Sequence, residues 1–318
     1  MTNSHNTAPT QFIEASGVRY AYRQFGASNG TPLVFLQHFR GGLDNWDPKV
    51  TDGLAKDRPV ILFNNAGVAS SGGEPADTVS GMAKHVVTLI NALGLKRADV
   101  LGFSLGGFVA QQVVLENPGL IRRVVLAGTG PQGGESMDAF TPKVAEHATQ
   151  ETPVIENFLY LFFSPSETSQ AAGRAFWERR HTRAYQDVPS SMAAMRAQAT
   201  AIARWGEVPK TDRYGQLKKI QQQVLVVNGQ NDIMVPSINS FILQQHIPDA
   251  TLILYPDSGH GAIFQYPELF VSHVRLFLEE QTARDAPPLG RDRAIRDPWL
   301  GTRRGKRSMK LSCASGAD

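Results

Sequence analysis

The sequence predicts an α/β protein with a mostly parallel sheet that is covered by helices on both faces. Short β-rich runs alternate with longer runs of helical periodicity, several short runs are apolar throughout, and turn residues separate them. Uninterrupted apolar strands are typical of sheets that are buried on both faces. A chain of 318 residues could hold two average domains. Folds of this class often form one core with an insertion, however, and we expect one core.

Seven strands and four helices can be placed along the chain from residue type and periodicity. Turn residues cluster at 26–32 and 117–119, between predicted elements. The short runs predict strands at residues 18–22, 33–37, 60–63, 100–103, 124–127, 224–228 and 251–255. The longer runs predict helices at residues 78–93, 105–117, 237–246 and 267–280.

Residues 131–217 interrupt this alternation, because they have helical patterns throughout and no convincing strand. We interpret them as a helical cap inserted into a core of residues 11–130 and 218–280. Aromatic residues gather in the cap, where they could exclude water from a pocket and hold an apolar substrate. Each of them could instead simply pack the cap onto the core. The residues that we expect to line the pocket are His38, Phe158, Phe162, Trp177 and Trp205.

The basic character of the chain is concentrated in its C-terminal residues. The sequence pI is about 9.0, but nine of the 32 Lys and Arg residues and only four of the 29 Asp and Glu residues lie from Gln281 onward. The preceding body is therefore close to neutral, which disfavours a nucleic-acid partner. We expect residues 281–318 to form a basic, disordered tail.

Other features restrict the location and the class of the protein. Residues 1–10 are polar and lack the apolar core of a signal peptide, so we expect a flexible N-terminus and a cytoplasmic location. No apolar run is long enough to cross a membrane. The single cysteine, Cys313, excludes an internal disulfide framework and a cysteine metal cluster. We expect no metal, no cofactor and no membrane partner, and the sequence leaves open whether the chain forms a homodimer.

The strongest chemical signal is Gly102-Phe-Ser104-Leu-Gly106, which lies between a predicted strand and a predicted helix. A serine on such a tight turn has a strained backbone, and Gly102, Gly106 and Gly107 would let the strand and the helix approach each other. The helix N-terminus then presents free N–H groups to developing negative charge. We therefore predict that Ser104 is a nucleophile.

A serine nucleophile needs a base, and the base needs a carboxylate to orient it. His260 lies on a loop after the last predicted strand and is the predicted base. Asp232 follows the preceding strand, at the edge where sites of open α/β sheets lie, and is the predicted acid. Asp257 is closer to His260 in sequence, but a turn residue of this kind more often bonds local backbone. The loop after residues 124–127 offers no acid before Glu135.

In this order and these contexts, the three residues make the chain resemble the α/β-hydrolase superfamily from about residue 12 to residue 280. Further matching pieces are Gly229-Gln-Asn-Asp232-Ile-Met-Val-Pro236, Ser258-Gly-His260 and Leu36-Gln-His38, the last before an oxyanion loop that ends at Trp46. The resemblance implies an eight-stranded sheet with a lid inserted after the sixth strand. It also implies acyl transfer that uses neither a metal nor a cofactor.

Two departures from the superfamily pattern affect the predicted site. The usual His-Gly of the oxyanion loop is His38-Phe39-Arg40 here, so the N–H of Phe39 or, in a shifted register, of Arg40 would join that of Leu105 in the oxyanion hole. The loop Asn64-Asn-Ala-Gly67-Val-Ala69-Ser replaces a segment that generally has Asp and a further Gly. We expect this loop to reshape the pocket wall.

The sequence thus predicts a serine hydrolase that cleaves a carboxylic ester or lactone of a small to medium, largely apolar substrate through an acyl-enzyme. The serine at position 104 disfavours members with an aspartate nucleophile, whose alkyl-enzyme chemistry requires a carboxylate there. A perhydrolase or haloperoxidase-like enzyme, a carbon-carbon bond hydrolase and a cofactor-free lyase would use the same triad. From another class, a ligand receptor on a hydrolase scaffold would keep the pocket without turnover.

Overall fold

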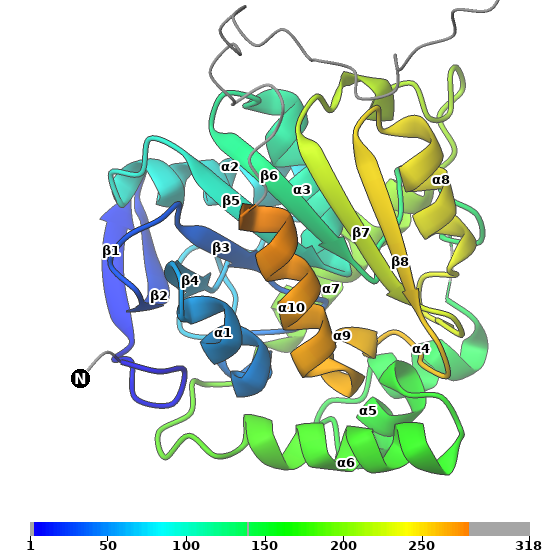
Figure 1. Ribbon diagram of the computed structural model, residues 1–318, viewed down its shortest axis with the longest axis horizontal. Helices are drawn as coiled ribbons and strands as arrows, with labels where there is room; N and C mark the ends of the chain where they lie inside the picture. The colour runs from blue at the N-terminus through cyan, green and yellow to red at the C-terminus, as the bar shows by residue number, and fades with distance from the viewer. Residues whose placement is uncertain (1–2, 139, 280–318) are drawn as a thin grey trace, which may run out of the picture. The chain divides into compact units, whose positions relative to one another are not determined.

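An eight-stranded sheet forms the centre of the computed structural model, which describes residues 3–138 and 140–279 (Figure 1). The strand order is β1-β2-β4-β3-β5-β6-β7-β8; β2 is antiparallel to both neighbours, and the other pairs are parallel. The strands are β1 (Gln11–Ala15), β2 (Val18–Gly26), β3 (Leu33–Leu36), β4 (Pro59–Phe63), β5 (Ala98–Phe103), β6 (Ile121–Ala127), β7 (Gln223–Gly229) and β8 (Ala250–Tyr255). The predicted fold class, a mostly parallel eight-stranded sheet, is therefore confirmed.

The strand at one edge, β1, is the one that residue patterns did not locate. Its five residues are exposed or only half-buried, so they lack the apolar run that marks the central strands. The neighbouring β2 continues to Gly26, further than predicted. Strand β6 begins at Ile121, three residues before its predicted start, and the remaining strands differ from the predicted ranges by two residues or fewer at either end.

Helices cover both faces of the sheet, as predicted, and each face has its own apolar core. One face packs against α1 (Pro48–Ala55), α9 (Ala262–Gln265) and α10 (Pro267–Glu279). The other packs against α2 (Val79–Ala92), α3 (Leu105–Glu116) and α8 (Ile238–His246). Along β3, Leu33 and Phe35 belong to the first core and Val34 and Leu36 to the second, because side chains alternate along a strand.

Helix α1 was not predicted, although its first residues carry a local signal. Asp47 accepts a hydrogen bond from the Lys49 N–H at 2.9 Å, and Pro48 occupies the first helical position. Both features favour a helix start. The helix is eight residues long, with Asp52 and Gly53 in its second half, and this interrupts the apolar pattern on which the prediction relied.

Four α-helices of the described residues lie between β6 and β7, in the segment interpreted as a cap over residues 131–217. They are α4 (Pro142–Ala148), α5 (Ile155–Phe162), α6 (Glu167–Arg180) and α7 (Met192–Gly206). In Figure 1, α5 and α6 lie beyond the carboxyl ends of the strands, next to α9. They therefore cover the carboxyl ends of the strands, where the predicted site residues lie. The predicted tail, residues 281–318, lies outside the described residues.

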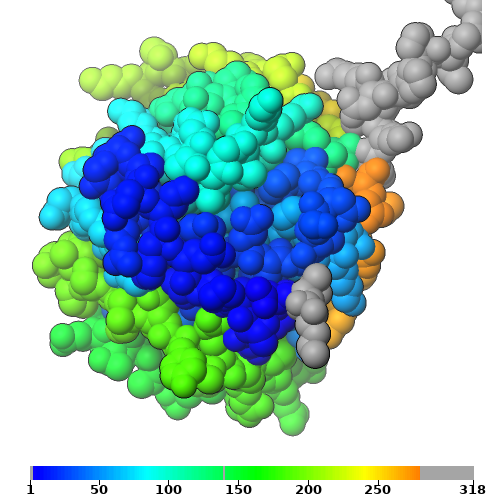
Figure 2. Space-filling model, turned by 90° about the vertical axis from the view of Figure 1, so that its left-hand side faces the viewer, coloured from blue at the N-terminus to red at the C-terminus, as the bar shows by residue number. Residues whose placement is uncertain are grey.

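The N-terminal residues correct one expectation. We expected residues 1–10 to be flexible, but His5 is buried, its N–H donates to Asp52 Oδ1 at 2.6 Å, and its Nδ1 lies 2.9 Å from Thr51 Oγ1. Arg183 donates to the carbonyl oxygens of His5 and Asn6. Figure 2 shows this N-terminal segment, in dark blue, against green residues of the segment between β6 and β7. Its polar residues are thus used in tertiary hydrogen bonds, which composition does not reveal.

Candidate active site

Ser104 occupies a sharp turn between β5 and α3. Its φ is 55° and its ψ is −119°, a conformation that costs a non-glycine residue free energy and that is found at functional turns. A Cβ at Gly102 would lie 2.3 Å from the carbonyl oxygen of Gly106, and one at Gly106 would lie 1.9 Å from that of Leu36. The two glycines therefore permit the close approach of strand and helix that raises Ser104 to the edge of the sheet.

His260 and Asp232 are paired on the loops that follow β8 and β7. His260 Nδ1 lies 2.8 Å from Asp232 Oδ2, and both side chains are buried. The other carboxylate oxygen of Asp232 accepts the N–H groups of Met234 at 2.8 Å and Val235 at 2.9 Å. Because the carboxylate only accepts, it holds the proton of His260 on Nδ1 and leaves Nε2 as the basic nitrogen.

The weaker sequence candidate for the acid, Asp257, has another partner. Its Oδ2 accepts a hydrogen bond from the Ser166 hydroxyl at 2.6 Å, and its φ of 44° places it in a turn.

The Asn231 N–H donates to the Ser258 carbonyl oxygen at 2.8 Å, which ties the loop of Asp232 to that of His260. Backbone contacts therefore fix the two loops relative to each other.

Ser104 and His260 both line a cavity of about 410 Å³ between the carboxyl ends of the strands and the helices α4 to α6. Four of the five residues expected in the pocket line it: His38, Phe158, Phe162 and Trp177. The expectation for Trp205 is wrong. Its ring stacks on Phe108 at a centroid distance of 5.4 Å, and its Nε1 donates to the Gly130 carbonyl oxygen at 3.3 Å. Trp205 thus belongs to the core on the α3 face of the sheet.

The end of α5 holds the histidine loop from the side of the cavity. The Phe162 ring lies 5.3 Å from the His260 ring, and its carbonyl oxygen accepts the Gly261 N–H at 2.7 Å. Phe103 contacts the imidazole from the core side, with a centroid distance of 5.0 Å. A larger residue at 261 would meet the Phe162 side chain at 2.9 Å. Phe162 therefore positions the predicted base as well as lining the pocket, a role that the sequence did not indicate.

Backbone N–H groups near Ser104 distinguish the two registers that the sequence left open for the oxyanion hole. The Arg40 N–H donates to Gln198 Oε1 at 2.7 Å and is therefore occupied. Within residues 3–138 and 140–279, no hydrogen bond is formed by the N–H of Phe39 or of Leu105, the first residue of α3. This arrangement favours the Phe39 register over the Arg40 register.

His38 is buried beside these groups as a neutral side chain. Burial lowers the pKa of His38 to about 3, even though its Nδ1 donates to the Phe39 carbonyl oxygen at 2.8 Å. The positive charge of Arg180 contributes to this lowering. The Nε2 atom of His38 has no hydrogen-bond partner in the described part of the chain. Through the hydrogen bond of its Nδ1, His38 fixes the turn that carries the Phe39 N–H.

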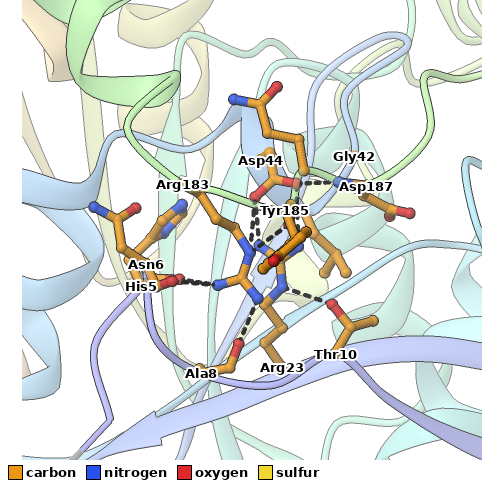
Figure 3. Close-up of polar contacts among 12 residues, drawn as sticks. His5, Asn6, Ala8, Thr10, Arg23, Gly42, Asp44, Arg183, Tyr185 and Asp187 are labelled. Carbon is orange, nitrogen blue, oxygen red and sulfur yellow. Dashed lines mark hydrogen bonds and ion pairs between the residues drawn. The ribbon is translucent and has the colours of Figure 1, made fainter.

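Charged residues of the cavity wall were not predicted, because no local motif marks them. Asp44 binds the buried Arg23 through both carboxylate oxygens and accepts the Asp187 N–H at 2.6 Å (Figure 3). Burial acts to raise the pKa of Asp44, but the hydrogen bonds and the charge of Arg23 leave it below its usual value. Arg183 joins the cluster and donates to the carbonyl oxygens of His5, Asn6 and Ala8. The cluster thus fastens the segment after α6 to the core.

Across the described residues, no group of three or more His, Cys, Asp or Glu side chains could hold a metal ion. Within the same ranges, no helix has the length and apolarity that a membrane crossing requires.

Comparison with known proteins agrees with the fold. A family model described as the alpha/beta hydrolase fold matches residues 31–267. A solved alpha/beta hydrolase fold protein from Chitinophaga pinensis is 44% identical, with a TM-score of 0.83 over 88% of this chain and all of that one. A pimeloyl-[acyl-carrier protein] methyl ester esterase from Nitrosomonas europaea is 27% identical over 77% of this chain and 94% of its own. The structure of Est816, described as an N-acyl homoserine lactone degrading enzyme, is 25% identical with a TM-score of 0.64 and covers 84% of this chain and all of its own.

Proposed function

Because the chain belongs to the α/β-hydrolase fold family and is a hydrolase of the general ester type, we propose that it is a serine hydrolase that forms an acyl-enzyme on Ser104. The observation that carries the proposal is the pairing of His260 Nδ1 with Asp232 Oδ2 at 2.8 Å, together with the position of His260 in the wall of the same cavity as the strained Ser104. A paired imidazole and a serine on a strand-to-helix turn are the parts that acyl transfer requires.

Each step of the proposed reaction can be assigned to a particular residue. His260 Nε2 takes the proton of the Ser104 hydroxyl as its oxygen attacks the carbonyl carbon, and the N–H groups of Leu105 and Phe39 stabilise the oxyanion. Collapse of the tetrahedral intermediate breaks the bond to the alcohol, which receives the proton from His260. Water, deprotonated by His260, then attacks the acyl carbon; the bond to Ser104 Oγ breaks, the acid leaves, and His260 returns the proton to Ser104. Asp232 holds the imidazole in one tautomer and stabilises its charged form.

The proposed substrate is a carboxylic ester or a lactone of small to medium size. A cavity of about 410 Å³ lies within the range of small-molecule sites, and aromatic rings from Phe158, Phe162 and Trp177 form part of its wall. The names of two relatives support the chemistry, since one is a methyl ester esterase and the other degrades a lactone. Parallel assays of esters, lactones, peroxide-dependent halogenation and carbon-carbon cleavage of diketones would test this choice. Preferential turnover outside the first two classes would contradict it.

Labelling with a fluorophosphonate probe, followed by peptide mapping, tests the nucleophile directly. We expect one adduct, on Ser104, because this probe reacts with activated serines. Ser190→Ala is the matched control, since Ser190 lines the same cavity and donates to the Arg40 carbonyl oxygen at 2.8 Å. This variant should label like the wild type. An adduct on another serine, or no adduct, would refute the proposal.

A further inference from the structure

Arg180, the last residue of α6, presents an uncompensated guanidinium to the cavity. It is one of the residues that line the cavity. Its Nε and Nη1 atoms are buried and have no hydrogen-bond partner within the described ranges. The guanidinium carbon lies 4.5 Å from the ring centre of Phe158 and 4.9 Å from that of Trp177. Aromatic faces thus hold the side chain, while part of its hydrogen-bonding capacity is unused.

The carboxylates of the cavity wall do not neutralise Arg180. Asp44, Glu151 and Asp187 line the cavity, but none forms an ion pair with Arg180 in the described part of the chain. Asp44 is already bound by Arg23, and Asp187 accepts hydrogen bonds from the Asn64 side chain and the Val188 N–H. Glu151 is exposed. The negative charges nearest the site are therefore engaged elsewhere or in solvent.

The other arginine of the cavity wall provides a contrast. The Arg40 guanidinium donates to the carbonyl oxygens of Ala148, Gln150 and Glu151, so its polar atoms have partners. Arg40 therefore has an evident structural role in holding the loop after α4. The Arg180 guanidinium packs on aromatic faces and is influenced by the charge of Asp44, but its Nε and Nη1 atoms donate no hydrogen bond within the described ranges.

Buried guanidinium nitrogen atoms without partners, such as Nε and Nη1 of Arg180, are unfavourable in the unliganded protein. Burial lowers the pKa of Arg180 to about 10, and the charge of Asp44 acts in the opposite direction. Arg180 therefore remains charged at neutral pH. A buried charge without a partner carries a desolvation penalty that an incoming anion relieves. Such a group favours ligands that carry a negative charge to that point of the cavity.

We propose that Arg180 binds a carboxylate of the substrate, so that the preferred substrates are esters or lactones with one free carboxylate remote from the scissile bond. This inference rests on the proposed function and names a substrate class for it. A planar guanidinium matches a carboxylate in shape and hydrogen bonding. A single negative charge suits the site better than a dianion, because Asp44 and Asp187 lie in the same wall. The aromatic rings around Arg180 would contact the apolar part between the carboxylate and the acyl group.

Two matched ester pairs test the proposal by steady-state kinetics. On the acyl side, the p-nitrophenyl half-ester of glutaric acid is compared with p-nitrophenyl pentanoate. On the alcohol side, 4-butyryloxybenzoate is compared with phenyl butyrate. We expect the wild type to prefer the carboxylate member of at least one pair. Arg180→Met should reduce kcat/KM for that member by about 10- to 100-fold, the usual range for a charged hydrogen bond.

The pattern of the loss separates binding from a structural role. In Arg180→Met the loss should lie mainly in KM, and turnover of the neutral member should change less than about threefold, because its transition state does not use the guanidinium. Arg180→Lys should restore part of the preference, since it keeps the charge but not the planar fork. Arg174→Met, an exposed arginine on the same helix, is the matched control and should behave like the wild type.

A binding measurement keeps the test independent of turnover. Calorimetric titration of Ser104→Ala with 4-phenylbutyrate and with its neutral amide should show preference for the acid, and Arg180→Met in the same background should remove it. The inference is overturned if the wild type prefers the carboxylate ester in neither kinetic pair. It is also overturned if the titration shows no preference for the acid over its amide. Equal losses on charged and neutral esters would overturn it as well. If the probe labels Ser104 and the wild type hydrolyses esters without preferring a carboxylate, only this inference is refuted. If the probe does not label Ser104, the proposed function is refuted.

Discussion

The two walls of the cavity are built in different ways. On the sheet side, Ser104, Asp232 and His260 each lie just beyond a strand and are held mainly by backbone contacts and by the hydrogen bond between Asp232 and His260. On the cap side, Phe158 and Arg180 come from helices and are held by ring packing. We infer that the chemistry of this protein depends on residues at the strand ends, whereas its selectivity depends on side chains that pack between helices of the other wall.

The largest effect on the sheet side should follow loss of the carboxylate. Asp232→Asn should reduce kcat for an ester by about 10³- to 10⁴-fold, because the amide no longer holds His260 in the productive tautomer. Stopped-flow or steady-state assays would measure this change. Asp257→Asn is the matched control, since Asp257 bonds Ser166, and it should retain near wild-type kcat. Equal losses in the two variants would show that the choice between the acids is wrong.

The turn around Ser104 should be intolerant of added volume. Gly106→Ala places a Cβ 1.9 Å from the Leu36 carbonyl oxygen, and neither backbone can give way without separating α3 from β3. We expect failure to fold or a loss of several kcal/mol of unfolding free energy, within the large effects of core overpacking. Gly119→Ala, where nothing lies within 4 Å of the new Cβ, should be nearly neutral. Chemical denaturation would measure the unfolding free energy of both variants, and equal values would contradict this expectation.

On the cap side, the stability of the protein should depend on Arg183, which joins the segment after α6 to the N-terminal residues. Arg183→Met leaves the carbonyl oxygens of His5, Asn6 and Ala8 without this donor and weakens the cluster around Asp44. We expect a loss of about 3 kcal/mol in unfolding free energy, as for breaking a buried polar cluster. Thermal denaturation would detect it.

The same variant distinguishes the two walls. KM for esters should rise more than kcat falls, because the cap wall is loosened and the strand ends are not. Arg196→Met, an exposed arginine of α7, is the control and should leave both quantities unchanged. A fall in kcat without a change in KM would contradict the division between the walls.

The smallest predicted effect concerns pH. Burial, aided by Arg23 and Arg183 and opposed by Asp44, lowers the pKa of His5 to about 4 from an ordinary 6.5. The unfolded chain therefore binds more protons than the folded chain between these values, and stability is lost as the pH falls from about 6.5 towards 4. His5→Asn, whose amide can replace Nδ1, should lose less stability than the wild type between pH 7 and pH 5. Equal losses in urea titrations would contradict this expectation.

The difference between the walls also explains how far the sequence could be interpreted. Ser104 and Asp232 follow apolar strands directly, so residue type and strand position sufficed to select them as candidates. Trp205 was assigned to the pocket because aromatic residues in the cap look alike in sequence, and only the packing against Phe108 distinguishes it. Arg180 lies in an ordinary helical pattern, which does not show that two of its guanidinium nitrogen atoms are buried or that Phe158 of α5 packs against it. The N-terminal residues were misjudged for the same reason.

The measurement that tests the account most directly is ester turnover by Ser104→Ala. The account predicts that hydrolysis of a p-nitrophenyl acyl ester falls by at least about 10⁴-fold, because removing the nucleophile removes the acyl-enzyme route. The circular dichroism spectrum and the melting temperature should stay close to those of the wild type, which would show that the fold is intact. Undiminished turnover by the folded variant would contradict the account.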